Sequence, residues 1–312
     1  MDYDGKSDYA PVEGIPDFMQ SSIIDWIEDA EFTLCPQVGY LYSYSKHVVE
    51  ERQRKSLIQK YERLSGHCYG LEENSSKEIF SHDANINQFG LEYVDFLLAS
   101  LSRYVPSTQV LKEEPEHVDK ASACIEKLEG ILNESRSIWQ IGERKGFVGL
   151  EKRVNPNMQQ MADPIIRSDT SAGKHLSKAW NCAFGRIPDY SQAYSEAIKA
   201  VEAATTPVLS PKDADATLSK NAQNLWQQSG WHFEIEPTRC DVPGGPIRLL
   251  MTGMMNSQPD RHGKTQFEEV TKAKAEAAVF TAVFLVQIFP YNYTTFLFSG
   301  QSGTSTGFLS VA

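Results

Sequence analysis

The sequence lacks the short motifs that mark several common enzyme classes. It contains no GxxxxGK[ST] phosphate loop and no GxGxxG dinucleotide-binding turn. HExxH and CxxC are also absent, and the adjacent His67 and Cys68 complete no set of metal ligands. We therefore predict neither P-loop nucleotide hydrolysis nor Rossmann-type binding, and we expect no metal and no cofactor.

Basic residues and cysteines are both scarce. The chain has 30 Lys and Arg against 41 Asp and Glu, a net charge of −11. This charge disfavours a broad basic face for duplex DNA, because nucleic-acid affinity rests on phosphate neutralisation, although a local basic pocket is compatible with it. Five scattered cysteines are typical of reduced thiols. The N-terminus lacks the basic start and apolar run of a signal peptide, so we expect a cytoplasmic protein.

Helical periodicity dominates the rest of the chain and predicts a mainly α fold. With 41% hydrophobic residues, the chain has ample material for a core. Pro207 is expected to close one helix, and Ser210-Pro211 to open the next. The predicted helices are one after Pro16, then 40–65, one around 91–101, 117–136, 156–168, 171–184, 189–204, 213–229, 247–257 and 267–289.

One segment alternates apolar and polar residues in place of the helical pattern. Residues 137–151 do so about a Glu143–Gly146 turn, which predicts a β-hairpin lying on helices. A chain of 312 residues suggests two domains. We predict a disordered tail at 1–14, a helical N-terminal domain at 15–135, a helical C-terminal bundle with the hairpin at 137–290, and a flexible tail at 291–312.

The last predicted helix is the most apolar part of the chain. Ala277 to Phe289 is almost wholly apolar, and aromatic residues follow up to Phe298. A membrane span needs about 20 continuous apolar residues, whereas Gln287 and Pro290 interrupt this run. We therefore expect a buried core helix and no stable membrane association, with a membrane-associated effector using residues 277–298 as the weaker alternative.

The most distinctive polar feature is Arg261-His262, in a polar loop before this helix. Histidine can take and give a proton near neutral pH, and arginine can hold a phosphate by two parallel hydrogen bonds. The pair therefore indicates metal-free cleavage of RNA, with Asn256, Gln258 and Asp260 as supporting residues. In the alternative interpretation the pair is structural, with Arg261 bound to Asp260 or to a helix end.

Five stretches of the C-terminal half resemble a known family. The chain is similar, over roughly residues 139–289, to an uncharacterised family of actinobacterial proteins that carry an abortive-infection C-terminal domain of the HEPN superfamily. The stretches are 179–194 (AWNCAFGRIPDYSQAY), 196–203 (EAIKAVEA), 216–218 (ATL), 260–263 (DRHG) and 275–286 (AEAAVFTAVFLV).

This resemblance implies a HEPN-like helical bundle that forms a homodimer and cleaves RNA without a metal in phage defence. Arg261 would bind phosphate and His262 would act as acid and base. In active members the two residues lie about one helical turn apart, whereas here they are adjacent. A non-catalytic helical interaction module therefore remains the alternative. We expect RNA as substrate, and a protein partner for the N-terminal domain.

Overall fold

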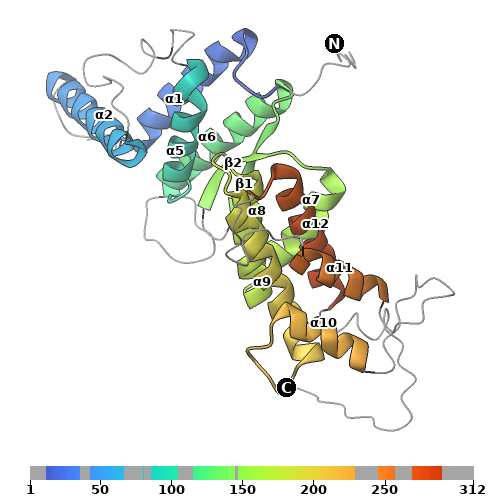
Figure 1. Ribbon diagram of the computed structural model, residues 1–312. Helices are drawn as coiled ribbons and strands as arrows, with labels where there is room; N and C mark the ends of the chain where they lie inside the picture. Colours follow the sequence, from blue (N-terminus) through green and yellow to red (C-terminus); the bar gives the residue numbers. More distant parts are fainter. Residues whose placement is uncertain are drawn as a thin grey trace. The chain divides into compact units, whose positions relative to one another are not determined.

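The computed structural model describes most of the chain as helices, with one two-stranded sheet (Figure 1). The predicted fold class, mainly α with a small hairpin, is thus confirmed. The chain divides into two compact units, Met1–Arg153 and Val154–Ala312. The described residues are 12–35, 43–66, 80, 86–104, 115–144, 147–228, 245–256 and 269–289.

Helices build most of the N-terminal unit around an apolar core. Trp26 is fully buried, and its indole Nε1 donates to the Cys124 carbonyl oxygen at 2.7 Å, which joins α1 to α6. Glu31 is also buried and accepts hydrogen bonds from Arg54 Nη2 at 2.7 Å and Tyr93 Oη at 2.6 Å. The elements are α1 (Asp17–Leu34), α2 (Ser43–Ser65), the π-helix η1 (Ile86–Gly90), α5 (Leu91–Leu101), α6 (Pro115–Glu134), β1 (Trp139–Arg144) and β2 (Phe147–Lys152).

The predicted hairpin is present and belongs to this N-terminal unit. β1 and β2 pair antiparallel, with Trp139 opposite Lys152. Trp139 and Leu150 are buried in the N-terminal core, and Asp95 Oδ1 on α5 accepts from the Leu150 backbone N–H at 2.6 Å. The division after Arg153 therefore falls later than the predicted boundary at 137, because the hairpin's apolar side chains pack on α5 and α6.

The end of the predicted N-terminal tail also takes part in the fold. Val12 forms a parallel bridge with Ser137, and its carbonyl oxygen accepts from the Ile138 N–H at 2.9 Å. Trp139 Nε1 donates to the Glu13 carbonyl oxygen at 2.8 Å. Residues 12–14 are therefore ordered by backbone pairing, which a polar composition does not reveal; residues 1–11 and the predicted tail at 291–312 lie outside the described residues.

The C-terminal unit is a bundle in which α8, α9 and α12 pack on one another, with α7, α10 and α11 around them (Figure 1). The chain turns tightly after α8 at Gly185, where a Cβ would lie 2.4 Å from the Asn181 carbonyl oxygen. The helices are α7 (Pro156–Arg167), α8 (Ser171–Phe184), α9 (Tyr190–Leu209), α10 (Leu218–Gln227), α11 (Gly245–Asn256) and α12 (Lys272–Ile288).

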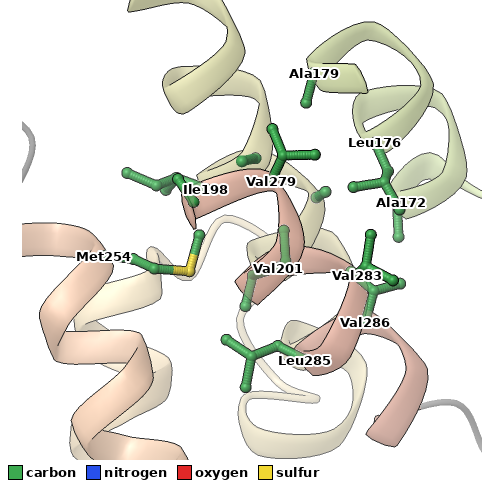
Figure 2. Close-up of a cluster of buried hydrophobic side chains, with 14 of the residues drawn as sticks. Ala172, Leu176, Ala179, Ile198, Val201, Met254, Val279, Val283, Leu285 and Val286 are labelled. Carbon is green, nitrogen blue, oxygen red and sulfur yellow. The ribbon is translucent and has the colours of Figure 1, made fainter. Parts of the chain in front are cut away.

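The apolar helix α12 forms the centre of this bundle. Its valines, Val279, Val283 and Val286, lie among side chains of α8 and α9 such as Leu176 and Val201, as Figure 2 shows. The predicted core helix is thus confirmed. Within the described part of the chain, no helix is long and apolar enough to cross a membrane.

Three predicted helix boundaries in this unit are wrong, and one of them is the start of α12, at Lys272 instead of 267. α9 continues through Pro207 to Leu209. Pro207 removes one backbone hydrogen bond, but the helix ends two residues later at Leu209, so little of α9 follows the break. α10 begins at Leu218 and not near Pro211, because the Thr217 side chain caps it by accepting from the Lys220 N–H at 3.4 Å. Residues 211–217 therefore form a loop.

Candidate functional site

The sequence-predicted site lies in the segment that follows α11. Of its five residues, only Asn256 is described, and it is the exposed last residue of α11. Gln258, Asp260, Arg261 and His262 lie outside the described residues. The structure therefore neither brings the Arg-His pair together nor separates it, and the predicted roles of these residues stay predictions.

The described residues gather four polar side chains around one buried carboxylate, Glu196. Its side chain is only 2% exposed. His175 Nδ1 on α8 lies 2.7 Å from Glu196 Oε2. Lys199 Nζ and Lys178 Nζ donate to Glu196 Oε1 at 2.9 Å and 3.1 Å, and Gln192 Nε2 donates to the same oxygen at 2.7 Å. Both carboxylate oxygens are therefore engaged, and together they join α8 to α9.

Helical spacing explains why these groups meet. His175 and Lys178 are three residues apart on α8, as are Glu196 and Lys199 on α9. Residues three or four apart share one face of a helix, so each helix presents its polar pair to the same place. The opposite, apolar face of each helix packs into the core, which brings the two polar pairs together.

The surroundings of Glu196 keep it ionised. Burial alone would raise its pKa, because a low-dielectric environment disfavours the charged form. Hydrogen bonds from His175, Lys199 and Lys178 outweigh burial and lower the pKa of Glu196 from 4.5 to about 2. Glu196 is therefore a carboxylate at neutral pH, and a carboxylate only accepts hydrogen bonds.

This carboxylate defines the orientation of the His175 ring. Because Glu196 accepts, Nδ1 of His175 carries the proton of their hydrogen bond, which leaves Nε2 of a neutral ring as an acceptor. A histidine held by a carboxylate in this way can take a proton at Nε2, and the carboxylate stabilises the cation that results. The His175 side chain is 34% exposed, so the ring remains accessible to a ligand.

His175 and Lys199 both line an open pocket of about 560 Å³. Small-molecule sites typically occupy roughly 300–1,000 Å³, so the volume suits a small ligand or one unit of a polymer. Its walls come from α8, α9 and the loop before α10. The lining residues are Ser171, His175, Lys199, Glu202, Ala203, Thr206, Pro207, Ser210, Pro211, Ala214, Asp215 and Ala216.

A buried polar network holds the α9–α10 side of the pocket in place. The Asn221 side chain is fully buried; its Oδ1 accepts from Ser210 Oγ at 2.6 Å. Its Nδ2 donates to Thr205 Oγ1 at 2.9 Å and to Thr206 Oγ1 at 3.0 Å. Asn224 Nδ2 adds a hydrogen bond to Ser210 Oγ at 2.7 Å. A satisfied buried network rigidifies its surroundings, so the pocket wall is preorganised.

A second carboxylate, Glu202, lies one helical turn beyond Lys199. Its Oε1 accepts from the backbone N–H of Leu218, the first residue of α10, at 2.8 Å. This bond helps to cap α10, whose first N–H groups have no partner within the helix. Asp215, in the loop before α10, is the second acidic side chain of the lining. The pocket therefore has a basic end, where Lys199 lies beside His175, and an acidic end at Glu202 and Asp215.

The acidity of the chain does not extend to this unit. The described residues 154–228, 245–256 and 269–289 hold ten Lys and Arg against nine Asp and Glu. The net charge of −11 therefore arises elsewhere in the chain. Because basic and acidic residues nearly balance in these ranges, their net charge does not repel an anion from the pocket.

Metal sites and hydrolase nucleophiles are two further sources of catalytic chemistry. Among the residues that the structure describes, no group of three or more His, Cys, Asp or Glu is placed to hold a metal ion. One GxSxG match, Gly303–Gly307, lies outside the described residues. A GxSxG nucleophile needs a strand–turn–helix setting, whereas the described C-terminal unit is helical.

Sequence reasoning missed His175, Glu196 and the pocket itself. A signal did exist, because His175 and Lys178 lie on the polar face of α8, together with Lys174 and Asn181. The loop that closes the pocket was assigned to a helix, and the Thr217 cap was the local sign against that assignment.

Comparison of the chain with protein-family models, with curated proteins and with solved structures found no match. The fold and the pocket geometry are therefore the basis for assigning a function.

Proposed function

We propose that the C-terminal unit cleaves RNA phosphodiester bonds without a metal, as an effector of phage defence of the abortive-infection type. The observation that carries the proposal is the His175 ring, held by buried Glu196 beside Lys199 at the edge of a polar pocket. Metal-free RNA cleavage needs a base for the 2′-hydroxyl proton and a cation for the phosphorane, and these two side chains match those needs.

In the proposed reaction, His175 Nε2 takes the proton of a ribose 2′-hydroxyl. The 2′-oxygen attacks the adjacent phosphorus, and the bond from phosphorus to the 5′-oxygen breaks. Lys199 stabilises the charge on the non-bridging oxygens, and the leaving 5′-oxygen takes a proton from solvent. The products are a 2′,3′-cyclic phosphate and a 5′-hydroxyl, and Glu196 stabilises the imidazolium formed at His175.

Arg261 and His262 belong to the same proposal as a second pair. The resemblance of the chain to HEPN domains assigns phosphate binding to Arg261 and acid–base catalysis to His262, within a homodimer. The helical architecture of the C-terminal unit supports a bundle of this kind. Parallel variants of His175 and His262 separate the two pairs, because each pair contains its own imidazole.

The test is cleavage of total RNA by the full chain in the presence of EDTA. We expect the wild type to leave cyclic phosphate ends and His175→Ala to reduce the rate by about 100-fold or more, as for loss of an acid–base group. His262→Ala is assayed alongside it. If the wild type leaves the RNA intact, or if both variants cleave as fast as the wild type, the proposal is wrong.

Two lysines of the cluster provide a matched control. Lys199 and Lys178 each donate to Glu196 Oε1, but only Lys199 lines the pocket. Lys199→Ala and Lys178→Ala therefore remove comparable ion pairs from Glu196. We expect a much larger loss of cleavage rate for Lys199→Ala. Equal losses would mean that the lysines act only by stabilising the fold.

A non-catalytic interaction module is the second candidate, and the outer face of α10 and α11 favours it. Trp226 is 50% exposed and Leu249 is 71% exposed. Arg248 Cζ lies 4.7 Å from the centre of the Trp226 ring. Aromatic and Arg side chains are enriched where proteins bind one another. This candidate predicts that no RNA product forms and that His175→Ala lowers only the melting temperature.

A further inference from the structure

The two ends of the pocket differ in charge and so in what they can recognise. Lys199 donates one hydrogen bond to Glu196 and retains two further N–H donors, whereas Nε2 of the neutral His175 ring is an acceptor and donates to a ligand only when it is protonated. An anionic group such as phosphate fits this end. Glu202 and Asp215 at the other end repel a second phosphate and accept hydrogen bonds from neutral donors. A ligand with one phosphate and nearby hydroxyl groups satisfies both ends.

The spacing between the ends suits a small unit. Lys199 and Glu202 are three residues apart on α9, so they share one face of the helix and are separated by about 4.5 Å along its axis. A single sugar phosphate can reach both side chains. Glu202 Oε1 is committed to the Leu218 N–H, and within the described residues Oε2 has no hydrogen bond.

The lining also lacks the groups that recognise a nucleobase. Among the described lining residues there is no Phe, Tyr or Trp, and His175 is the only aromatic ring. Aromatic stacking is the usual way in which proteins hold unpaired bases. The 2′-hydroxyl, in contrast, is the group that distinguishes RNA from DNA.

We infer that the pocket is a ribose-phosphate site, in which phosphate binds Lys199 beside His175 and Glu202 Oε2 accepts from a ribose hydroxyl, without contact to the base. The inference rests on the proposed function, which makes an RNA chain the source of the ribose phosphate. A free sugar phosphate or a nucleotide carries the same chemical groups. Glu202 is then the residue that distinguishes ribose from deoxyribose.

The binding test uses the full chain and titration calorimetry with ribose 5-phosphate, 2-deoxyribose 5-phosphate and inorganic phosphate. We expect the wild type to bind ribose 5-phosphate about tenfold more tightly than the deoxy sugar, as for one hydrogen bond to a charged acceptor. Equal affinity of the wild type for the two sugars would overturn the inference, and this comparison depends on no variant.

Glu202→Gln tests the assigned residue while it retains a carbonyl oxygen for the Leu218 N–H. We expect this variant to bind both sugars equally and to keep its affinity for inorganic phosphate. Glu269→Gln makes the same change of charge at an exposed position outside the pocket lining, so it should retain the tenfold preference. A Glu202→Gln variant that retains the preference contradicts the assignment.

A cleavage assay with RNA homopolymers distinguishes an RNA chain from a free sugar phosphate as the ligand. It also distinguishes the ribose-phosphate site from the proposed nuclease activity. Equal cleavage of poly(A), poly(U) and poly(C) with loss of activity in His175→Ala supports both the ribose-phosphate site and the nuclease. If ribose 5-phosphate binds more tightly than the deoxy sugar but RNA is not cleaved, the ribose-phosphate site is supported and its ligand is a free sugar phosphate. The same result overturns the proposed nuclease activity. Cleavage that depends on His175 but prefers one base overturns the inference and leaves the nuclease standing.

Discussion

Replacing Glu196 by glutamine should destabilise the C-terminal unit by about 2 to 3 kcal/mol at neutral pH. The fall of its pKa from 4.5 to about 2 corresponds to about 3 kcal/mol at 1.36 kcal/mol for each unit of pKa. Lys178 and Lys199 are 59% and 45% exposed, so water screens part of this attraction. Glutamine keeps the shape of the side chain but removes its charge, so the variant isolates the electrostatic contribution.

The sign of the pH dependence follows from the direction of the pKa shift. Because folding lowers the pKa of Glu196, the unfolded state binds a proton more readily than the folded state does. The stabilisation by Glu196 is therefore complete above pH 4.5 and is lost as the pH falls from 4.5 towards 2. Glu196→Gln has no such carboxylate and should lose this part of the pH dependence.

Urea unfolding followed by far-UV circular dichroism measures this difference. Wild type, Glu196→Gln and the control Glu269→Gln are compared at steps from pH 7 to pH 2.5, and hydrogen exchange of α8 and α9 peptides locates the effect in the C-terminal unit. The wild type and Glu196→Gln should differ most at pH 7, and the difference should narrow steadily from pH 4.5 to pH 2.5. A constant difference across this range would refute the reasoning, because it would show that the charge of Glu196 contributes nothing.

Two further predictions concern buried groups outside this cluster. Asn221→Ala should lower the free energy of unfolding by about 2 kcal/mol, because the buried Ser210 hydroxyl loses its acceptor and the buried Thr205 hydroxyl loses its donor. Ser219→Ala, at an exposed position on α10, is the control, and equal urea midpoints for the two variants would contradict the prediction. The Cys124 thiol should resist iodoacetamide at pH 8 in the native protein and react after unfolding in urea, because burial raises its pKa to about 12. Rapid labelling of Cys124 in the native protein, measured by peptide mass spectrometry, would contradict this.

Local patterns were sufficient to predict the type of most elements. The Ala277–Phe289 run predicted a buried helix, because a helix that is apolar on all sides has no face for water. The alternation through Trp139 and Leu150 predicted the hairpin, since a period of two places every second side chain on one face. These patterns act over a few residues, and the described structure confirms them.

Boundaries and partners depended on contacts that no local pattern contains. Pro207 was expected to end a helix, yet the last turn of α9 accommodates it. The hairpin was assigned to the wrong side of the domain boundary, because its anchor, Asp95, lies 55 residues before Leu150. The loop at 211–217 was assigned to a helix, so the pocket wall that this loop forms was not predicted.

The candidate site shows most clearly which features follow from local patterns and which depend on tertiary contacts. Glu196 and Lys199, three residues apart on one helix, have the spacing of an ordinary solvated ion pair, and His175 is a single histidine on another helix. The sequence by itself determined that both helices exist and that each has a polar stripe. Only the packing of α8 against α9 decided that these stripes face each other and bury the carboxylate, because burial depends on which surfaces the core brings together.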